Sequence, residues 1–233
     1  MAKIASKRYR KAAELVDSSK AYSLEEAVQL LKKLPAGKSD QTVEISFSLG
    51  VDPRQSDQMI RGTVALPHGS GKKVRVLVFA SGKAAEEAKA AGAEYVGFED
   101  LIKKVTEGFQ DFDVAVATPE AMTEVRKLGK VLGPRGLMPN PKTGTVSEDA
   151  AKAVRECKAG RVEYKIDKTS NISVVCGKVS FDEKLLAENA SAVLNAIAKA
   201  KPSSAKGRYI KNCVIASTFS PGIKLDVSSY TAN

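Results

Sequence analysis

The stretch KKVRVLVFASGKAAEEAKAAGAEYVGFEDLIKKVTEGFQDFDVAVAT, residues 72–118, alternates apolar runs with segments of helical composition. The runs KKVRVLVFA, AEYVGF and DFDVAVAT predict strands, and AAEEAKAAG and EDLIKKVTEG predict the helices between them. Strands and helices that alternate at this spacing form βαβ units on a parallel sheet. Residues 74–79 and 114–117 are almost wholly apolar, which is typical of strands that are covered on both faces.

Two further helices are predicted after this stretch, at PEAMTEVRKLG (119–129) and at about 147–158. Ser147 is the expected N-cap of the second helix, because serine side chains accept hydrogen bonds from the first helical N–H groups. The helix is expected to stop at Ala159 and Gly160, since glycine commonly ends helices.

The flanking segments follow a different pattern. Val43, Ile45, Phe47 and Leu49 alternate with polar residues, which predicts a strand with one solvent-exposed face. Residues 161–167 and 171–177 bracket the turn sequence DKTS and predict a hairpin. A helical apolar period follows at Leu185, Leu186, Ala190, Val193, Leu194 and Ile197, and a last alternating strand covers residues 213–218.

These patterns predict a two-domain protein of mixed α/β and α+β class. Residues 1–68 and 160–233 would build one α+β domain from both chain ends, and residues 69–159 would form an inserted, doubly wound α/β domain. The two crossings, near PHGSG and KAGR, would then form a hinge.

The charge of the chain points to a polyanionic partner. The 233 residues carry a formal charge of +10, which favours nucleic acid first and an anionic membrane second. Residues 69–159 have 15 Lys and Arg against 13 Asp and Glu, whereas the remainder has 22 against 14. The split domain therefore holds most of the excess and is the first place to look for an RNA surface.

A membrane role is not favoured by the sequence. It contains neither an apolar run of membrane-spanning length nor a secretory signal, and it lacks an amphipathic basic helix with bulky apolar residues. We therefore expect a soluble, cytosolic protein.

The loop GKVLGPRGLMPNPKTGT, residues 129–145, resembles a phosphate-binding glycine loop in composition. Pro141 stands where the second glycine of G-x-x-x-x-G-K-[ST] belongs, and proline has no N–H to offer a phosphate. The alternative hypothesis, an enzyme that binds a nucleotide or another phosphate ligand on the inserted domain, thus has weak support. We instead interpret Lys130, Arg135 and Lys142 as a secondary basic patch on a loop whose glycines and prolines fix the backbone conformation.

Catalytic and metal-binding signals are sparse. His68 is the single histidine, and Asp111 and Asp113 are more typical of a turn than of a catalytic dyad. Cys157, Cys176 and Cys213 are widely spaced without metal-ligand patterning, so we expect reduced, buried thiols. No catalytic residue, metal or cofactor is predicted.

Six ordered segments carry a resemblance to a known family. The loop at 129–146 closely resembles the signature of the ribosomal protein L-one family of the large subunit, bacterial type. The other five segments match that family in order and at its spacings: LGVDPRQSDQMIRGTVALPHGSGK (49–72), KAAGAEYVGFEDL (89–101), FDVAVATPEAM (112–122), KAGRVEYKIDKT (158–169) and AKGRYIK (205–211). The resemblance covers nearly the whole chain.

The resemblance implies a fold and a function. The fold is a split terminal domain with an inserted Rossmann-like three-layer α/β domain and a two-strand hinge. The function is that of a structural constituent of the large ribosomal subunit that binds 23S rRNA at the mobile side stalk, beside the tRNA exit site. It further implies assistance in the release of deacylated exit-site tRNA, repression of translation of the protein's own operon mRNA, and a free protein that is monomeric.

The family's main RNA surface falls on the split domain of this sequence. By resemblance, the RNA-binding residues are Lys38, Ser39, Asp40, Thr42, Glu44, Asp167, Lys168, Ser217, Thr218, Phe219 and Ser220. The family usually has phenylalanine at the position of Ser39, and methionine and glycine at those of Phe219 and Ser220. Thr218 is the strongest candidate, because a hydroxyl can both donate to and accept from a ribose 2′-OH.

Overall fold

The structure is a computed structural model that describes residues 6–35 and 37–230. Its architecture is mixed α/β, as the sequence predicts. The chain divides into two compact units: unit 1 comprises Met1–Gly71 and Val162–Asn233, and unit 2 comprises Lys72–Arg161. The division thus falls after Gly71 and Arg161, whereas the predicted division falls after residues 68 and 159.

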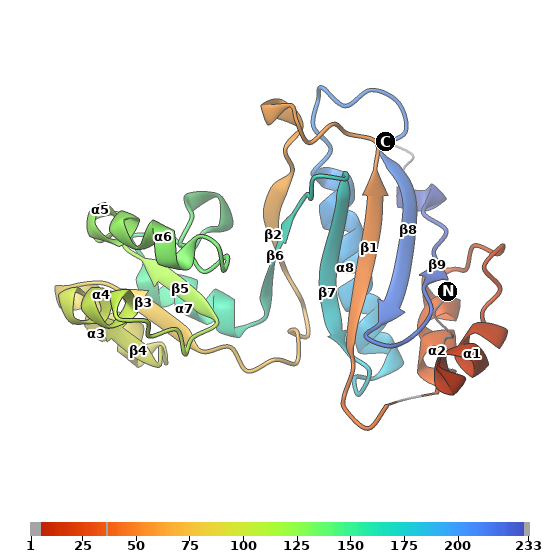
Figure 1. The fold of residues 1–233 in the computed structure, drawn as a ribbon, viewed down its shortest axis with the longest axis horizontal. Helices are drawn as coiled ribbons and strands as arrows, with labels where there is room; N and C mark the ends of the chain where they lie inside the picture. Colours follow the sequence, from red (N-terminus) through yellow and green to blue (C-terminus); the bar gives the residue numbers. More distant parts are fainter. Residues whose placement is uncertain (1–5, 36, 231–233) are drawn as a thin grey trace. The chain divides into compact units, whose positions relative to one another are not determined.

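Unit 1 is built on a four-stranded sheet with the order β7-β1-β8-β9. The strands are β1 (Thr42–Leu49), β7 (Asn171–Lys178), β8 (Ile210–Ser217) and β9 (Ile223–Lys224), and β1 is antiparallel to both of its neighbours. Figure 1 shows β7, β1 and β8 side by side, with α8 behind them.

Helices α2 (Leu24–Lys33) and α8 (Glu183–Lys199) pack against one face of this sheet, and α1 (Lys7–Glu14) precedes them in the chain. The buried residues of β1 are Val43, Ile45, Phe47 and Leu49, which are the alternating positions that the sequence predicts. The intervening residues of β1 therefore lie on the opposite, open face of the sheet.

The hairpin predicted from residues 161–167 and 171–177 is wrong. Strand β6 (Arg161–Lys165) pairs with β2 (Arg61–Ala65) in a separate two-stranded sheet, whereas β7 pairs with β1. The turn between them is tight, since the Asp167 N–H donates to the Asn171 carbonyl at 2.9 Å. Pairing with β2 needs Gly62, because a Cβ there would lie 2.6 Å from the Tyr164 hydroxyl oxygen.

Unit 2 contains a parallel sheet with the order β4-β3-β5. The strands are β3 (Val76–Phe79), β4 (Tyr95–Gly97) and β5 (Val114–Ala117), and every residue of β3 is fully buried. The helical segments are α3 (Gly82–Ala90), α4 (Glu99–Thr106), α5 (Met122–Val125), η2 (Arg126–Leu128), α6 (Gly129–Leu132), η3 (Pro141–Thr143) and α7 (Ala150–Lys158).

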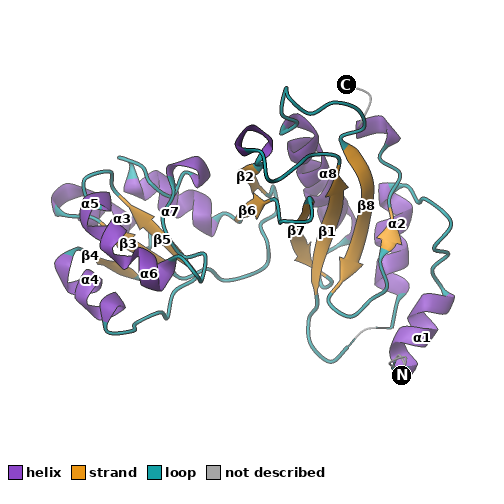
Figure 2. Ribbon diagram, turned by 45° about the horizontal axis from the view of Figure 1, so that its top comes forward, coloured by secondary structure: helices purple, strands orange, loops and turns teal. Residues whose placement is uncertain are grey.

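Two apolar clusters cover the two faces of this parallel sheet. Leu77 and Phe79 pack with residues of α4, α5 and α6, whereas Val76 and Val78 pack with residues of α3 and α7. Figure 2 shows these helices around the three strands. Burial on both faces explains why the strands of unit 2 are continuous apolar runs.

Two predicted helices of unit 2 differ from the structure. The segment 119–129 is not one helix but begins with a turn and continues as α5, η2 and α6. Helix α7 is capped by Asp149 rather than Ser147, because the Asp149 side chain accepts a hydrogen bond from the Lys152 N–H at 2.8 Å. Ser147 instead donates its N–H to the Ala117 carbonyl at 3.2 Å, which extends the edge of the sheet at β5. The end of α7 at Ala159 and Gly160 is confirmed, with Gly160 at φ 100°.

Candidate nucleic-acid interface

Two of the sequence-predicted segments meet at one end of the β7-β1-β8 sheet. Residues 38–44 run into β1, and residues 217–220 follow β8, which pairs with β1 from Val43↔Ser217 onward. The Thr218 N–H donates to the Thr42 carbonyl at 3.1 Å, and the Thr42 N–H donates to the Thr218 hydroxyl at 3.2 Å. Antiparallel pairing thus brings together residues that are 176 positions apart in the chain.

Thr218 keeps an exposed hydroxyl while its backbone is fixed. Its Oγ1 accepts from the Thr42 N–H and lies 3.4 Å from the Thr42 carbonyl, as a long donor contact. A hydroxyl oxygen has two acceptor positions, so one remains for a ligand. Lys178 of β7 donates to the Thr42 hydroxyl at 2.8 Å and adds a cation to the same end of the sheet.

Gln41 organises the turn after β8. It is only 5% exposed, and its Oε1 accepts hydrogen bonds from the Ser217 hydroxyl at 2.9 Å and from the Phe219 N–H at 3.1 Å. Its carbonyl accepts the N–H of Val179 at 2.9 Å, so one residue connects the ends of β7, β1 and β8. Sequence reasoning missed both Gln41 and Lys178, because neither departs from the pattern of an ordinary polar residue at a strand end.

The polar residues of the first segment have different surroundings. Asp40 is engaged, since its carboxylate accepts from the Ser180 N–H at 3.2 Å and from the Ser180 hydroxyl at 2.9 Å. Lys38 and Ser39 are exposed beside it. Glu44 is exposed on the open face of β1, opposite Val175 and Ala216.

Phe219 and Ser220 are accommodated without backbone strain. The Ser220 hydroxyl accepts from the Ser217 N–H at 2.8 Å and donates to the Pro221 carbonyl at 2.9 Å, which closes the turn. Phe219 is 48% exposed, and the Arg8 guanidinium lies 4.7 Å from the centre of its ring. The turn therefore presents one aromatic ring and one cation next to Thr218.

Asp167 and Lys168 lie at the opposite end of the sheet. Asn171, which follows their turn, pairs with Ser48 near the far end of β1. Six residues of β-strand separate Ser48 from Thr42, which corresponds to about 20 Å at ~3.3 Å per residue. The structure therefore does not bring the turn at 167–170 together with Thr218, although both border the same open face.

The turn at Asp167 is rigidly held. The Asp167 carboxylate accepts hydrogen bonds from the N–H groups of Asn171 and Thr169 at 2.7 and 2.8 Å and from the Thr169 hydroxyl at 2.8 Å. These bonds, the Asn171 N–H first, lower the pKa of Asp167 below its usual value. Its charge is thus already satisfied within the turn.

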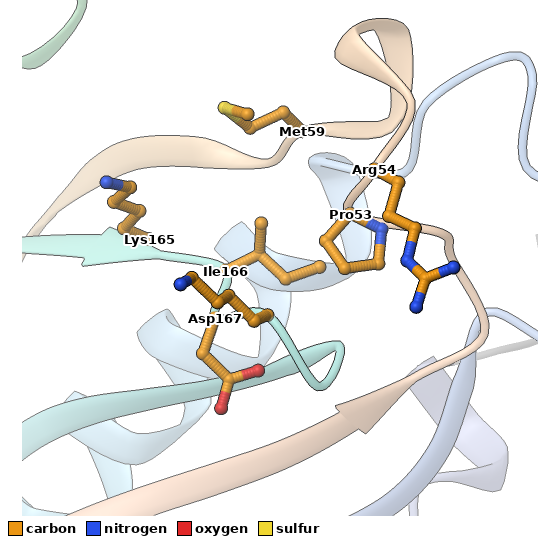
Figure 3. Close-up of a pocket in the computed structure, with 7 residues that line it drawn as sticks. Pro53, Arg54, Met59, Lys165, Ile166 and Asp167 are labelled. Carbon is orange, nitrogen blue, oxygen red and sulfur yellow. The ribbon is translucent and has the colours of Figure 1, made fainter.

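A pocket of about 820 Å³ lies beside this turn in unit 1. Figure 3 shows Ile166 and Pro53 between the side chains of Met59, Arg54 and Lys165. Lys168 completes the cationic rim, and Met59 is 55% exposed. Within the described residues, Arg54, Lys165 and Lys168 take part in no ion pair. The pocket therefore combines an apolar wall with three cations and one carboxylate, that of Asp167, which leaves a net excess of positive charge.

The open face between these two ends combines hydroxyl groups with the carboxylate of Glu44 and the apolar side chains of Val175, Val214 and Ala216. The hydroxyls of Ser46 and Ser173 lie 2.8 Å apart on neighbouring strands, and Ser48 follows on β1. Such a face offers hydrogen bonds to ribose and phosphate rather than stacking surfaces.

The basic loop of unit 2 is fixed by its own hydrogen bonds. The Asn140 side chain accepts the Lys142 N–H at 2.8 Å, and the buried Thr143 hydroxyl donates to the Asn140 carbonyl at 3.0 Å. Gly144 adopts φ 65°, and a Cβ there would lie 2.6 Å from the Arg161 guanidinium. Pro141 starts η3, where no N–H is needed, so the loop is a stable turn and not a phosphate cradle.

The predicted patch residues Lys130, Arg135 and Lys142 are exposed on and around this loop. They belong to unit 2, whereas Thr42 and Thr218 belong to unit 1.

The residues considered for catalysis make structural contacts. Asp113 accepts hydrogen bonds from Lys72 at 2.6 Å and from Arg75, and Asp111 pairs with the same Arg75. The Lys72 hydrogen bond is the largest cause that lowers the pKa of Asp113, to about 2. His68 bonds to Glu188 on α8 rather than to a serine or cysteine.

The three cysteines lack the environment of reactive thiols. Cys157, Cys176 and Cys213 are buried free thiols, and burial raises the pKa of Cys176 and Cys213 to about 12. Among the described residues there is no cluster of three or more potential metal ligands, and no helix is long and apolar enough to cross a membrane.

Comparison with known proteins identifies the class. The profile of the Ribosomal protein L1p/L10e family matches residues 31–221, so the chain belongs to that family of ribosomal proteins, and the resemblance found in the sequence is confirmed. The chain is similar to the large ribosomal subunit protein uL1 of two strains of Lactobacillus delbrueckii subsp. bulgaricus. In each case 57% of 220 aligned residues are identical, which covers 94% of this chain and 95% of the relative. Membership makes the chain a ribosomal protein, a class that acts in translation and is not a class of enzymes.

Proposed function

We propose that the protein is a structural constituent of the large ribosomal subunit that binds 23S rRNA at the side stalk through unit 1. The observation that carries this proposal is the meeting of Thr42 and Thr218, residues 176 positions apart, through mutual hydrogen bonds at an exposed sheet end. Hydroxyl groups held on a rigid backbone suit the recognition of folded RNA through its 2′-OH groups and phosphates.

The cations around this sheet end supply the electrostatic part of binding. Lys38 is exposed, Lys178 donates to Thr42, and Arg8 lies over Phe219. Contacts to phosphates provide affinity and position, whereas hydroxyl contacts provide selectivity for RNA shape. We assign unit 1 as the RNA-binding domain and unit 2 as the inserted domain on this basis.

Two further roles are part of the proposal. The turn at Asp167 and Lys168 provides a second contact for RNA about 20 Å along the sheet, and the secondary basic patch of Lys130, Arg135 and Lys142 on unit 2 contacts the deacylated tRNA whose release the protein assists. Repression of the protein's own mRNA would use the Thr218 surface, with a leader that imitates the rRNA target. The free protein is proposed to be a cytoplasmic monomer that associates with the ribosome.

The test is binding of the full chain to a side-stalk rRNA fragment, compared with an unrelated hairpin of equal length over a salt series. Specific binding predicts tighter binding to the stalk fragment at every salt concentration. Thr218→Val keeps the shape of the side chain but removes the hydroxyl, and it should weaken binding about tenfold, or ~1.4 kcal/mol. Thr106→Val on α4 removes an exposed hydroxyl in unit 2 and serves as the matched control. Equal affinity for both RNAs would refute specific recognition.

A further inference from the structure

Helix α1 concentrates positive charge at its beginning. Four of its first five residues are basic: Lys7, Arg8, Arg10 and Lys11. Its first turn contains no acidic residue. Cations at this end oppose the helix dipole, and like charges three or four positions apart repel each other. The arrangement is unfavourable for the isolated helix, and a bound polyanion would relieve it.

The basic residues of α1 form a stripe on one side of the helix. Lys7, Arg10 and Lys11 follow the i, i+3, i+4 spacing that places side chains on one face. All three are exposed, whereas Ala12 is 2% exposed and packs into the core of unit 1. Ala12 thus packs the helix against the core of unit 1, and the basic stripe faces the solvent. Within the described part of the chain, none of the three takes part in an ion pair.

Arg8 connects this helix to the turn after β8. Its guanidinium lies 4.7 Å from the centre of the Phe219 ring, within the range of a cation–π contact. Gly37 leaves room for this contact, since a Cβ at Gly37 would lie 3.0 Å from an Arg8 guanidinium nitrogen. Phe219 directly follows Thr218, so the beginning of α1 adjoins the proposed RNA surface.

We infer that α1 is a second arm of the RNA interface: Arg8 holds the helix against Phe219, and Lys7, Arg10 and Lys11 bind phosphates of the RNA that contacts Thr218. The inference rests on the proposed RNA-binding function and adds an element outside the predicted residues. It commits to the phosphate backbone as the ligand, because flexible cations on an exposed stripe offer charge without a base-reading geometry.

The first experiment compares two triple variants of the full chain on the side-stalk rRNA fragment. Lys7→Gln/Arg10→Gln/Lys11→Gln removes the stripe, and Lys184→Gln/Lys199→Gln/Lys201→Gln makes the same change of charge on and after α8. Loss of three phosphate contacts should reduce the magnitude of the negative slope of log affinity against log salt by about 2 to 3. The control variant should keep a slope close to that of the wild type, and thermal unfolding of both should show an intact fold.

The second experiment tests the Arg8 contact by a double-mutant cycle with Arg8→Gln and Phe219→Leu. If the two residues are coupled, the affinity of the double variant for the RNA should be no lower than that of the single variant with the lower affinity. A stripe variant with the wild-type slope, or strictly additive effects in the cycle, would overturn the inference while wild-type binding still supports the proposed function. Absence of specific wild-type binding would refute both.

Discussion

Replacement of Gln41 by methionine should weaken RNA binding, although Gln41 is not itself among the residues predicted to contact RNA. Methionine has a similar length and fills the same buried site, but it cannot accept the Ser217 hydroxyl and the Phe219 N–H. Each lost hydrogen bond costs about 1 kcal/mol on average, and a buried donor without a partner costs about 1–3 kcal/mol. We therefore expect the free energy of unfolding of unit 1 to fall by about 2 kcal/mol.

The effect on binding follows from the loss of order in the turn. Without Gln41, residues 217–220 must be ordered when RNA binds, and about 1 kcal/mol of ordering cost corresponds to about fivefold weaker affinity. Urea unfolding and a filter-binding titration with the stalk fragment measure the two quantities. Gln29→Met on the exposed side of α2 is the matched control. A clear loss of stability with unchanged affinity would show that the turn is ordered without Gln41 and would refute this reasoning.

Three further changes test the contacts inside each unit. Gly144→Ala should destabilise unit 2 by about 1–3 kcal/mol, because the residue has φ 65° and a Cβ would meet Arg161; hydrogen exchange of the loop measures the loss. Asp113→Asn should lower stability at pH 7 by about 1–2 kcal/mol. Since the folded pKa of Asp113 is lowered to about 2, the wild-type advantage is present above the unfolded pKa and disappears as the pH falls through about 2. Asn189→Ala should cost unit 1 about 3 kcal/mol in urea unfolding, because this fully buried amide donates to two carbonyls and accepts the His68 N–H.

Local patterns in the sequence were sufficient for most elements of the fold. The strand at Val43, Ile45, Phe47 and Leu49 and the fully apolar β3 were predictable because burial on one or both faces imposes a period that can be read directly. The apolar period of α8 is similarly clear, with Leu186, Ala190, Val193, Leu194 and Ile197 buried.

The errors in the fold have a common physical origin in long-range pairing. The sequence around DKTS indicates a turn, and the turn exists, but strand partners are chosen by tertiary packing that a local pattern does not contain. Gly62 on β2, about 100 residues before Tyr164, decides where β6 pairs. The N-cap of α7 was predicted at the wrong residue for a similar reason, since the Ser147 N–H instead donates a hydrogen bond to the Ala117 carbonyl at the edge of the sheet.

The candidate site was predictable only through resemblance to the family. Its charge excess indicated the split domain, but no local signal marks Thr42 and Thr218 as neighbours, because their contact depends on the antiparallel register of β1 and β8. Gln41 and Lys178 were missed as members of this site, since each acts through a contact with a residue far away in the chain.

Phe219 and Ser220, the two positions after Thr218 where the resemblance implies a departure from the family pattern, belong to one local arrangement. Ser220 adds a side chain, yet its hydroxyl closes the turn by bonding the Ser217 N–H and the Pro221 carbonyl. The turn thereby holds Phe219 at the surface, where the guanidinium of Arg8 on α1 lies over the ring in a cation–π contact. An aromatic ring in this position gives the guanidinium a site that keeps its charge exposed to a phosphate. Substitution at Phe219 should therefore affect RNA binding through α1 as well as through the turn itself, which is the dependence that the double-mutant cycle measures.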